Sequence, residues 1–564
     1  MKRNPYDVLL EKEAGLLLAR PPADLVAEFI RKSKEEMRHV DADNEWKYVN
    51  FANWLHTVAY VARLKGGRWS RAAAARELIL FLFSRLLQAA KGDRWYHNQP
   101  GKGDSNIDRF VLLPFIEAYL LTEDFLDGSL ASRITGKVKG VLDIQLREYG
   151  QRKPSPAPNK DIYICRQRRN SYYPNMDVYY CLLMYHGHRM TGDARYGKDF
   201  RRYLKHLEDA QFPGGAWTYI NGTNECPVYH DINVLLLGRL FHLSGNRSAA
   251  TMIRKSVPYY PLVVERNLIS ENYTDPWWKH YWSPQAPHAP DTVASLTGDG
   301  RNRWIGNRLR RSLVSTGDPY SIYAAMLWKP VRAVSPKQKY VVYDADIEGP
   351  RGRFRDWAWA ATARYGSDTV VGALSTRPGD GVTGLLAVTP EIELGKSQYH
   401  VRGMSLGMTP DGTKGVTSLR KDGSTFNVTY RMAHFRSIWE TAPFPYQWEC
   451  RQQWRLDRRA LRGKITVTSL AVQSCPAPWI RIRLGQRKKL IRRGPALFSY
   501  GPFQVRVLKT DLNLTRIAKG PAFPFSLDND STEVILHTIN EKRYAAGRSF
   551  ETDLEISFEP RPGK

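Results

Sequence analysis

The sequence has few cysteines. Its 564 residues include five of them, namely Cys165, Cys181, Cys226, Cys450 and Cys475, and no two form a Cys-x-x-Cys pair. Cysteines this sparse and odd in number disfavour both a disulfide framework and a structural zinc site. They fit a reducing compartment best.

Long hydrophobic runs are also absent. The longest, such as 78–83 and 234–237, are far shorter than the roughly 18 residues that a membrane helix needs, so no membrane partner is expected. The N-terminus MKRNP is basic, but Asp7, Glu11 and Glu13 interrupt the residues that follow, so no signal peptide is recognised. The sequence predicts a cytoplasmic protein, or a periplasmic or secreted one if an export signal was removed.

Acidic residues are in short supply relative to basic ones. Lys and Arg total 84 against 56 Asp and Glu, giving a net charge of +28 and a pI near 9.8. This charge implies an anionic partner, namely nucleic acid, an acidic lipid surface or an acidic polysaccharide. No helix-turn-helix, RNP or zinc-finger pattern is present and the charge is spread along the chain, so nucleic acid is not expected.

Up to about residue 330 the apolar residues have helical spacing. Segments 107–121, 175–190 and 232–243 carry them three and four positions apart, and each ends at a polar turn. Gly192 lies in Thr-Gly-Asp, Gly245 in Ser-Gly-Asn and Gly298 again in Thr-Gly-Asp, at intervals of 53 residues (245 − 192 and 298 − 245). This period fits one helical hairpin with its loops, so an array of helix pairs is predicted.

From about Tyr340 the pattern changes to short alternating segments rich in β-branched and aromatic residues. Examples are 340–343, 426–430, 465–468 and 554–558, separated by turn signals such as Asp422-Gly423. This pattern predicts antiparallel β-structure. A Pro-bracketed connector at 329–336 marks the change, so we expect a helical domain at 1–335 and a β domain at 336–564.

Unusual residues gather in two loops that each end at a predicted helix N-terminus. The first loop is 168–177 (RRNSYYPNMD) and the second is 214–231 (GGAWTYINGTNECPVYHD). If the helix pairs curl into a ring, these ends meet at one mouth, where backbone N–H groups and helix dipoles favour an anion. Aromatic rings beside Arg and Asn suit a cleft for sugars.

The second loop resembles a known family. The segment 225–230 (ECPVYH), ten residues after Gly215, resembles the "DG…E-x-S-P-x-Y-H" signature of heparinase II/III-type and alginate-type polysaccharide lyases, with Gly214 and Cys226 where the family has Asp and Ser. The resemblance implies the fold of those enzymes. That fold is an N-terminal incomplete (α/α) toroid of helical hairpins at 1–335, followed by an antiparallel β-sandwich domain at 336–564.

The resemblance also implies catalytic residues. Tyr229 matches the family tyrosine that acts as acid or base. When Asp177 is aligned with the Asp of the family's "N-N-H-G-x-x-x-D" loop, Asn170 takes the place of the Asn that neutralises the uronate carboxylate, and Tyr172 takes the place of the His. His230 follows Tyr229 and points about 100° away on a helix, so it is expected to orient the site or to bind substrate.

The chemistry of β-elimination explains these residue types. The reaction removes the proton at C5 of a uronate and expels the O4 substituent, and C5–H is a very weak acid until the carboxylate charge is neutralised. An amide or a guanidinium does this, which gives roles to Asn170 and Arg169. A phenol can take the proton as phenolate or donate one as phenol, and its usual pKa of about 10 must be lowered by nearby cations for the first role.

Further residues in or near these loops are expected to bind the sugar chain. They offer rings for stacking and polar groups for hydroxyls and carboxylates, and they are Arg169, Tyr173, Asn175, Trp217, Tyr219, Asn224, Asn106, Trp278 and His280. The position of Asn106 favours a role as a helix N-cap over one in the mouth, and the run 277–282 (WWKHYW) would serve equally well as a domain interface. His186 and His188 fit a helix C-terminus without any metal, so neither a metal nor a cofactor is expected.

These observations predict a metal-independent polysaccharide lyase. Its partner would be a uronate-containing anionic polysaccharide of glycosaminoglycan or alginate type, cleaved to leave C4–C5 unsaturated ends. One alternative is a glycoside hydrolase on a similar toroid, with Asp177, Glu225 and Asp231 as acid and base. The other is a polyanion-binding protein without catalytic activity.

Overall fold

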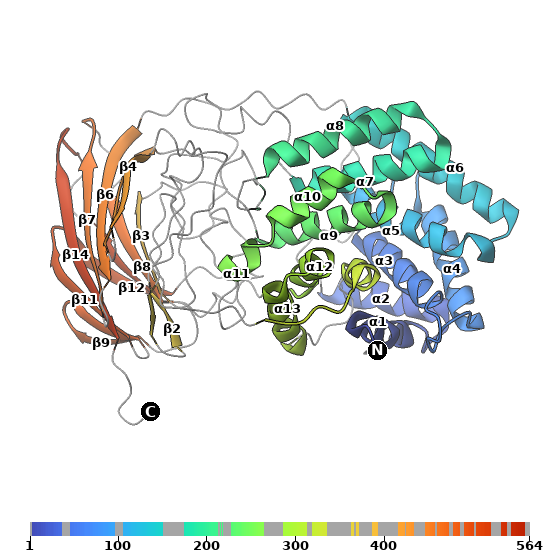
Figure 1. Cartoon of the computed structure of the whole chain (residues 1–564), viewed down its shortest axis with the longest axis horizontal. Coiled ribbons are helices and arrows are strands. Elements are labelled where there is room, and N and C mark those ends of the chain that lie inside the picture. Colours follow the sequence, from blue (N-terminus) through green and yellow to red (C-terminus); the bar gives the residue numbers. More distant parts are fainter. Residues whose placement is uncertain are drawn as a thin grey trace.

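The structure is a computed structural model of the chain. It describes residues 3–36, 46–95, 105–150, 174–211, 215, 217, 227–263, 286–312, 319–334, 363–365, 368–371, 386–392, 416–422, 425–433, 446–456, 460–472, 478–484, 490–500, 503–519, 532–537 and 543–558. Within these ranges the last helix ends at Leu327 and the first strand begins at Ala363 (Figure 1). The domain boundary predicted near residue 335 falls between the two and stays a prediction.

Helices make up the N-terminal part. They are α1 (Pro5–Leu17), α2 (Pro22–Glu36), α3 (Trp46–Val61), α4 (Ala73–Ala89), α5 (Ser105–Thr122), α6 (Gly128–Gln145), α7 (Pro174–Thr191), α8 (Ala194–Ala210), α9 (Pro227–Ser244), α10 (Arg247–Lys255), α11 (Tyr259–Val263), α12 (His288–Thr297), α13 (Gly300–Ser312) and α14 (Ser321–Leu327), with short helical turns η1 (Glu123–Phe125) and η2 (Leu146–Gly150). The three helices predicted from apolar spacing are present as α5, α7 and α9. None of the described helices is both long and apolar enough to span a bilayer.

Helices α5 and α7 run parallel. Near their starts the rings of Phe110 and Tyr179 meet at 5.0 Å, and near their ends Glu117 Oε1 lies 3.1 Å from His186 Nε2. The two contacts occur in the same order along both helices, and a parallel pair requires this. The N-termini of α5 and α7 therefore lie at the same end of the molecule.

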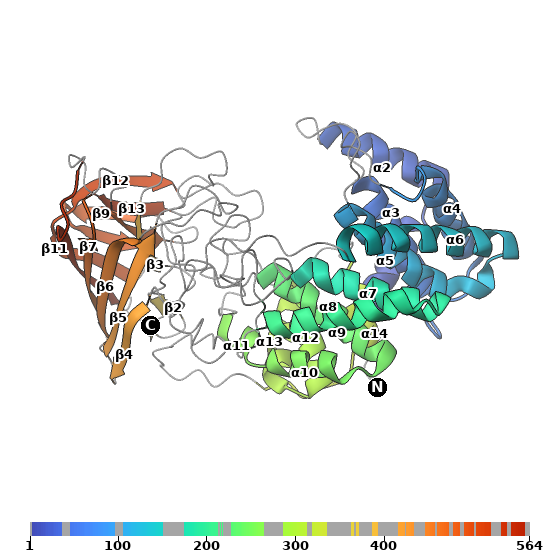
Figure 2. The same ribbon diagram turned by 90° about the horizontal axis from the view of Figure 1, so that it is seen from above.

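Helix α8 returns along α7 and leads to α9. The Tyr180 hydroxyl of α7 donates to Asp199 of α8 at 2.6 Å. At the far end of α8, the Leu207 carbonyl accepts from the Trp217 indole N–H at 3.1 Å, and the Trp217 ring lies 5.1 Å from that of His230 at the start of α9. The N-terminus of α9 therefore lies at the same end of the molecule as those of α5 and α7. Helices α7, α8 and α9 lie side by side in both views (Figures 1 and 2).

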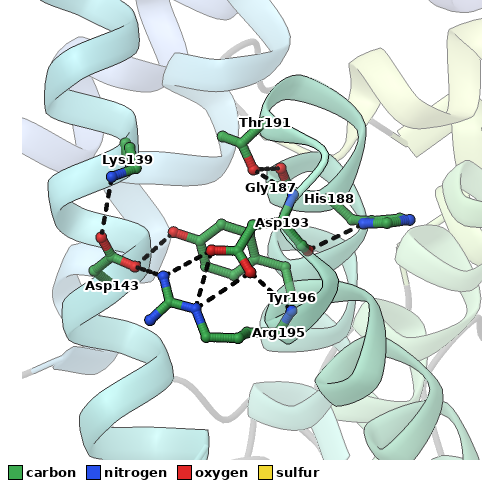
Figure 3. Close-up of polar contacts among 8 residues, drawn as sticks. All are labelled: Lys139, Asp143, Gly187, His188, Thr191, Asp193, Arg195 and Tyr196. Carbon is green, nitrogen blue, oxygen red and sulfur yellow. Dashed lines mark hydrogen bonds and ion pairs between the residues drawn. The ribbon is translucent and has the colours of Figure 1, made fainter.

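The turn between α7 and α8 has a specific hydrogen-bond pattern. The Thr191 hydroxyl donates to the Gly187 carbonyl at 2.7 Å, closing the last turn of α7. Gly192 has φ 70°, a left-handed conformation that favours glycine. The Asp193 side chain accepts from the Arg195 N–H at 2.8 Å and so caps α8 (Figure 3).

The same turn recurs twice. The equivalent residues are Ser244, Gly245 and Asn246 between α9 and α10, and Thr297, Gly298 and Asp299 between α12 and α13. In both turns the hydroxyl donates to the carbonyl four residues earlier at 2.6 Å, the glycine has positive φ (66° and 79°), and the third residue caps the next helix. The 53-residue period is therefore a structural repeat of helix pairs.

The C-terminal strands form antiparallel sheets. They are β1 (Ala363–Tyr365), β2 (Asp368–Val371), β3 (Leu386–Ile392), β4 (Val416–Asp422), β5 (Thr425–Ala433), β6 (Tyr446–Leu456), β7 (Ala460–Ser469), β8 (Pro478–Leu484), β9 (Leu490–Gly494), β10 (Leu497–Tyr500), β11 (Phe503–Thr510), β12 (Asn513–Lys519), β13 (Thr532–His537) and β14 (Ser549–Phe558). The described strands give sheets ordered β4-β5-β6-β7-β14-β11-β10-β9, β12-β13-β8-β3 and β1-β2.

Alternating residues separate the two faces of the large sheet. Ile465, Val467 and Leu554 are buried, whereas Arg462 and Glu555, on paired strands, form an ion pair at 2.8 Å on the outer face. The four-stranded sheet lies beside the large one, on the side toward the helices (Figures 1 and 2). The fold is an (α/α) toroid followed by an antiparallel β-sandwich, as predicted.

Candidate active site

A buried group of three polar side chains connects α5, α7 and α9. Glu117 of α5 accepts from Arg239 of α9, with Nε 3.1 and 3.2 Å from the two carboxylate oxygens and Nη2 2.5 Å from Oε2, and it also contacts His186 of α7. All three side chains are buried. Burial alone would raise the pKa of Glu117, but the Arg239 charge and the His186 hydrogen bond hold it well below its ordinary value. We call Glu117, His186 and Arg239 the charged layer.

The charged layer is a reference level from which the positions of three predicted site residues can be measured along their helices. Asn106, Asn175 and Tyr229 each lie ten or eleven residues before the layer residue of their own helix. At 1.5 Å per residue, their backbones stand about 15 to 17 Å above the layer, in the first turns of α5, α7 and α9. The structure therefore brings these three positions to one level at one end of the ring. The Asn106 side chain lies outside the described residues.

Asn175 is buried in the first turn of α7, and its Oδ1 has no hydrogen-bond partner among the described residues. The neighbouring carboxylate is engaged, because Asp177 accepts from the Tyr149 hydroxyl at 2.5 Å. The Arg109 guanidinium lies over the Tyr149 ring, 4.1 Å from its centroid. An amide oxygen accepts hydrogen bonds, so Oδ1 could bind only a donor such as a sugar hydroxyl, whereas a carboxylate would have to be bound by the Nδ2 of the amide.

Tyr229 and His230 lie next to each other but in different surroundings. Tyr229 is half-buried, whereas His230 is 1% exposed and stacks on Tyr259 with ring centroids 3.8 Å apart. Burial lowers the pKa of His230 to about 3, so its imidazole is neutral. Neither ring nitrogen has a hydrogen-bond partner among the described residues. This position suits the expected orienting role better than contact with substrate.

Trp217 is 1% exposed, and its indole N–H is engaged by the Leu207 carbonyl. No ring face is open to a sugar, which differs from the contact expected from the sequence. Trp217 instead packs the end of α8 against the start of α9 and supports His230 from one side. Its burial follows from the long-range packing of α8 and α9, which a local pattern does not reveal.

The structure does not describe every predicted site residue. Arg169, Asn170, Tyr172, Tyr173, Tyr219, Asn224, Trp278 and His280, together with Glu225 of the hydrolase alternative, lie outside the described residues. Their roles stay predictions.

The charged layer was not predicted from the sequence. The sequence pattern explains His186 by its place near a helix C-terminus without any metal; in the structure it contacts Glu117, 69 residues away in the chain. His188 does lie in the last turn of α7, with Nδ1 3.1 Å from the Asp193 carbonyl (Figure 3). The layer could have been suspected from single charged residues, such as Glu117 and Arg239, within otherwise apolar helix faces.

Comparison with known proteins identifies the fold. No protein-family model matches the chain, and no curated protein matches it. Among solved structures, Streptomyces coelicolor A3 chondroitin AC lyase in complex with chondroitin sulphate is similar at 11% identity and a TM-score of 0.52, over 99% of this chain and 83% of that one. A tyrosine-to-alanine mutant of that lyase is similar at 12% identity and a TM-score of 0.53, again over 99% of this chain and 83% of that one.

A Paenibacillus xanthan lyase matches less well, at 8% identity and a TM-score of 0.40, over 99% of this chain and 60% of that one. Glycoside hydrolases also occur among the structures of lower similarity. The similarity to the two chondroitin AC lyase structures shows that the chain has a polysaccharide lyase fold.

Proposed function

We propose that this protein is a polysaccharide lyase that cleaves a uronate-containing anionic polysaccharide by β-elimination. The observation that carries the proposal is the common level of Tyr229 and Asn175, in the first turns of parallel helices at one end of a toroid with the chondroitin AC lyase fold. The net charge of +28 supports an anionic polymer as the substrate. The 225–230 signature supports a relationship with heparinase II/III-type and alginate-type lyases in particular.

In the proposed reaction a base removes the C5 proton of the uronate. The electrons of the C5–H bond form the C4–C5 double bond, the C4–O4 bond breaks, and the departing oxygen takes up a proton. Tyr229 serves as the acid or base, with Tyr172 as the other candidate for the base. The first turns of α7 and α9 add backbone N–H groups and positive dipole ends that favour the anionic sugar.

The uronate carboxylate must be neutralised for C5 to become acidic. Asn170 and Arg169 take this role in the proposal. Asn175, in the first turn of α7, is proposed to donate to the same sugar through its Nδ2. His230, neutral and stacked on Tyr259, keeps the first turn of α9 in place. No carboxylate is needed as the proton acceptor in this scheme.

The surroundings of two carboxylates are less favourable for the hydrolase alternative. Asp177 accepts from Tyr149 at 2.5 Å and Asp231 accepts from Tyr260 at 2.7 Å, and both carboxylates are buried. A glycosidase needs one carboxylic acid that reaches the glycosidic oxygen and a second carboxylate on the opposite side of the sugar. Two carboxylates already bound to buried phenols do not offer this.

The experiment is an absorbance assay for the C4–C5 unsaturated uronate on a panel of chondroitin sulphate, hyaluronan, heparin, alginate and xanthan. We expect the wild-type protein to produce the chromophore from at least one polymer and Tyr229→Phe to produce none. Chromophore formation by Tyr229→Phe at the wild-type rate would remove Tyr229 from the mechanism. New reducing ends without the chromophore would replace the lyase by a hydrolase, and binding without any product would leave a polyanion-binding protein.

A further inference from the structure

Helix α13 is unusually basic. It contains five arginines and no acidic residue, and the arginines are Arg301, Arg303, Arg308, Arg310 and Arg311. Two of the five are structural: Arg303 Nη1 donates to the buried carboxylate of Asp291 at 2.6 Å, and Arg310 forms an ion pair with the same carboxylate. Both guanidinium groups also stack on Trp328, at 3.6 and 4.7 Å from a ring centroid.

The other three arginines share the outer face of α13 with one tryptophan. Arg301, Trp304, Arg308 and Arg311 are spaced at i, i+3, i+7 and i+10, which keeps them within a sector of about 80° and spreads them over about 15 Å of helix. The arginines are exposed and Trp304 is half-buried. We call these four residues the α13 arginine face.

Two of the three positive charges on the α13 arginine face are not balanced by an acidic side chain among the described residues. Arg301 forms an ion pair with Asp299 at 3.0 Å, whereas Arg308 and Arg311 have no acidic partner among the described residues. The Arg308 guanidinium lies over the Trp304 ring, 4.8 Å from its centroid, so its orientation is partly fixed before any ligand arrives. The negative C-terminal end of the helix dipole favours Arg308 and Arg311, but it does not explain a partly exposed indole between them and Arg301.

The inner side of helix α13 is linked to the candidate active site through α11. Asn302 of α13 donates to the Val257 carbonyl at 2.8 Å, just before α11 begins. Tyr259, the first residue of α11, stacks on His230, which follows Tyr229. Both views show α11 and α13 together at the end of the helical half nearer the strands (Figures 1 and 2).

We propose that the α13 arginine face is a second binding surface for the acidic polysaccharide, outside the catalytic mouth. Guanidinium groups bind carboxylates and sulphates through paired hydrogen bonds, and an indole stacks on a pyranose face. A row of such groups fits a linear polymer with repeated anionic groups better than a single small anion. Because the two surfaces would act on one chain, long polymers gain affinity over short ones. The inference rests on the proposed acidic substrate.

The test compares two double variants that remove the same charge. Arg308→Gln/Arg311→Gln alters the arginine face, and Lys198→Gln/Arg201→Gln alters exposed basic residues of α8 that also lack an acidic partner among the described residues. Fluorescence anisotropy measures the binding of labelled chondroitin sulphate polymer and of its tetrasaccharide. We expect the α13 variant to weaken polymer binding about fivefold and tetrasaccharide binding clearly less, and the α8 variant to change neither comparably.

Equal losses in the two double variants, or no loss in the α13 variant, would overturn the inference. So would a wild-type protein that binds neither probe, or a single-stranded DNA of equal charge that competes with the same dependence on Arg308. Arg308→Lys/Arg311→Lys keeps the net charge and removes the forked donors, so we expect a smaller loss than with Gln, and circular dichroism checks the folding of each variant. The readout is binding, so a failed arginine face remains distinguishable from a failed elimination assay.

Discussion

Arg239 of α9 donates from Nε and Nη2 to the carboxylate of Glu117 of α5 in the interior of the toroid, 122 positions away in the chain. The pair fixes the height of α9 against α5, and His186 fixes α7 at the same level. Because helices are stiff, this contact also sets the relative height of the first turns, where Tyr229 and Asn175 lie. The charged layer therefore positions the site from about 15 Å below it.

Glu117→Gln tests the layer. It leaves the Arg239 charge buried without its counter-ion, so we expect the free energy of unfolding to fall by about 3 to 5 kcal/mol, measured by urea denaturation. The matched control is Asp209→Asn, which breaks the exposed Lys205–Asp209 pair of α8 and should cost about 0.5 kcal/mol or less. Similar losses in the two variants would show that the layer is not structurally important.

The stability should depend on pH through two buried histidines. Burial lowers the pKa of His56 to about 4 and that of His230 to about 3, from an ordinary value of 6.5. Between these values and 6.5 the unfolded chain binds protons that the folded chain does not, so the free energy of unfolding falls as the pH drops below 6.5. Denaturation at pH 7 and pH 5 measures this fall. We expect His230→Phe, which keeps a ring against Tyr259, to reduce it; an unchanged pH dependence would refute the assignment.

Replacing glycine by alanine should have opposite effects on stability in the repeated turn and in a helix interior. Gly245→Ala forces a left-handed backbone with φ 66° on a residue with a Cβ, so it should destabilise the protein by about 1 kcal/mol although no atom lies within 4 Å of that Cβ. Gly136→Ala, in the middle of α6 and equally unobstructed, should stabilise it by about 0.5 to 1 kcal/mol. Thermal unfolding of the two variants gives the sign, and destabilisation by both would contradict the account of the turn.

Much of the fold followed from local patterns. The apolar spacing in α5, α7 and α9, and the recurrence of Gly192, Gly245 and Gly298, depend on residues close in sequence, so they could be identified directly. The charged layer depends on helices that meet only in the folded toroid, and the burial of His230 depends on Tyr259, 29 positions later. Neither could be derived from residue spacing. The Tyr229 position was predicted from a short signature, and its role is still a proposal.

Asn175 provides a test of the site that is independent of Tyr229. If its amide binds the anionic sugar, Asn175→Ala should lower kcat/KM on the responsive polymer by at least about tenfold, and the near-isosteric Asn175→Asp should lower it further because its carboxylate repels the uronate. Initial rates of chromophore formation measure both. Equal activity of Asn175→Asp and the wild type would exclude contact between this side chain and the uronate.

Hydrolysis adds a water molecule across the cleaved bond, whereas β-elimination does not. This difference gives the most direct test of the claim that the protein is a lyase. The responsive polymer is digested in water enriched in oxygen-18, and the products are weighed by mass spectrometry. We predict non-reducing ends that are one water lighter than hydrolysis products and no oxygen-18 incorporated at the bond cleaved. Saturated products carrying one oxygen-18 atom at the new reducing end would contradict β-elimination.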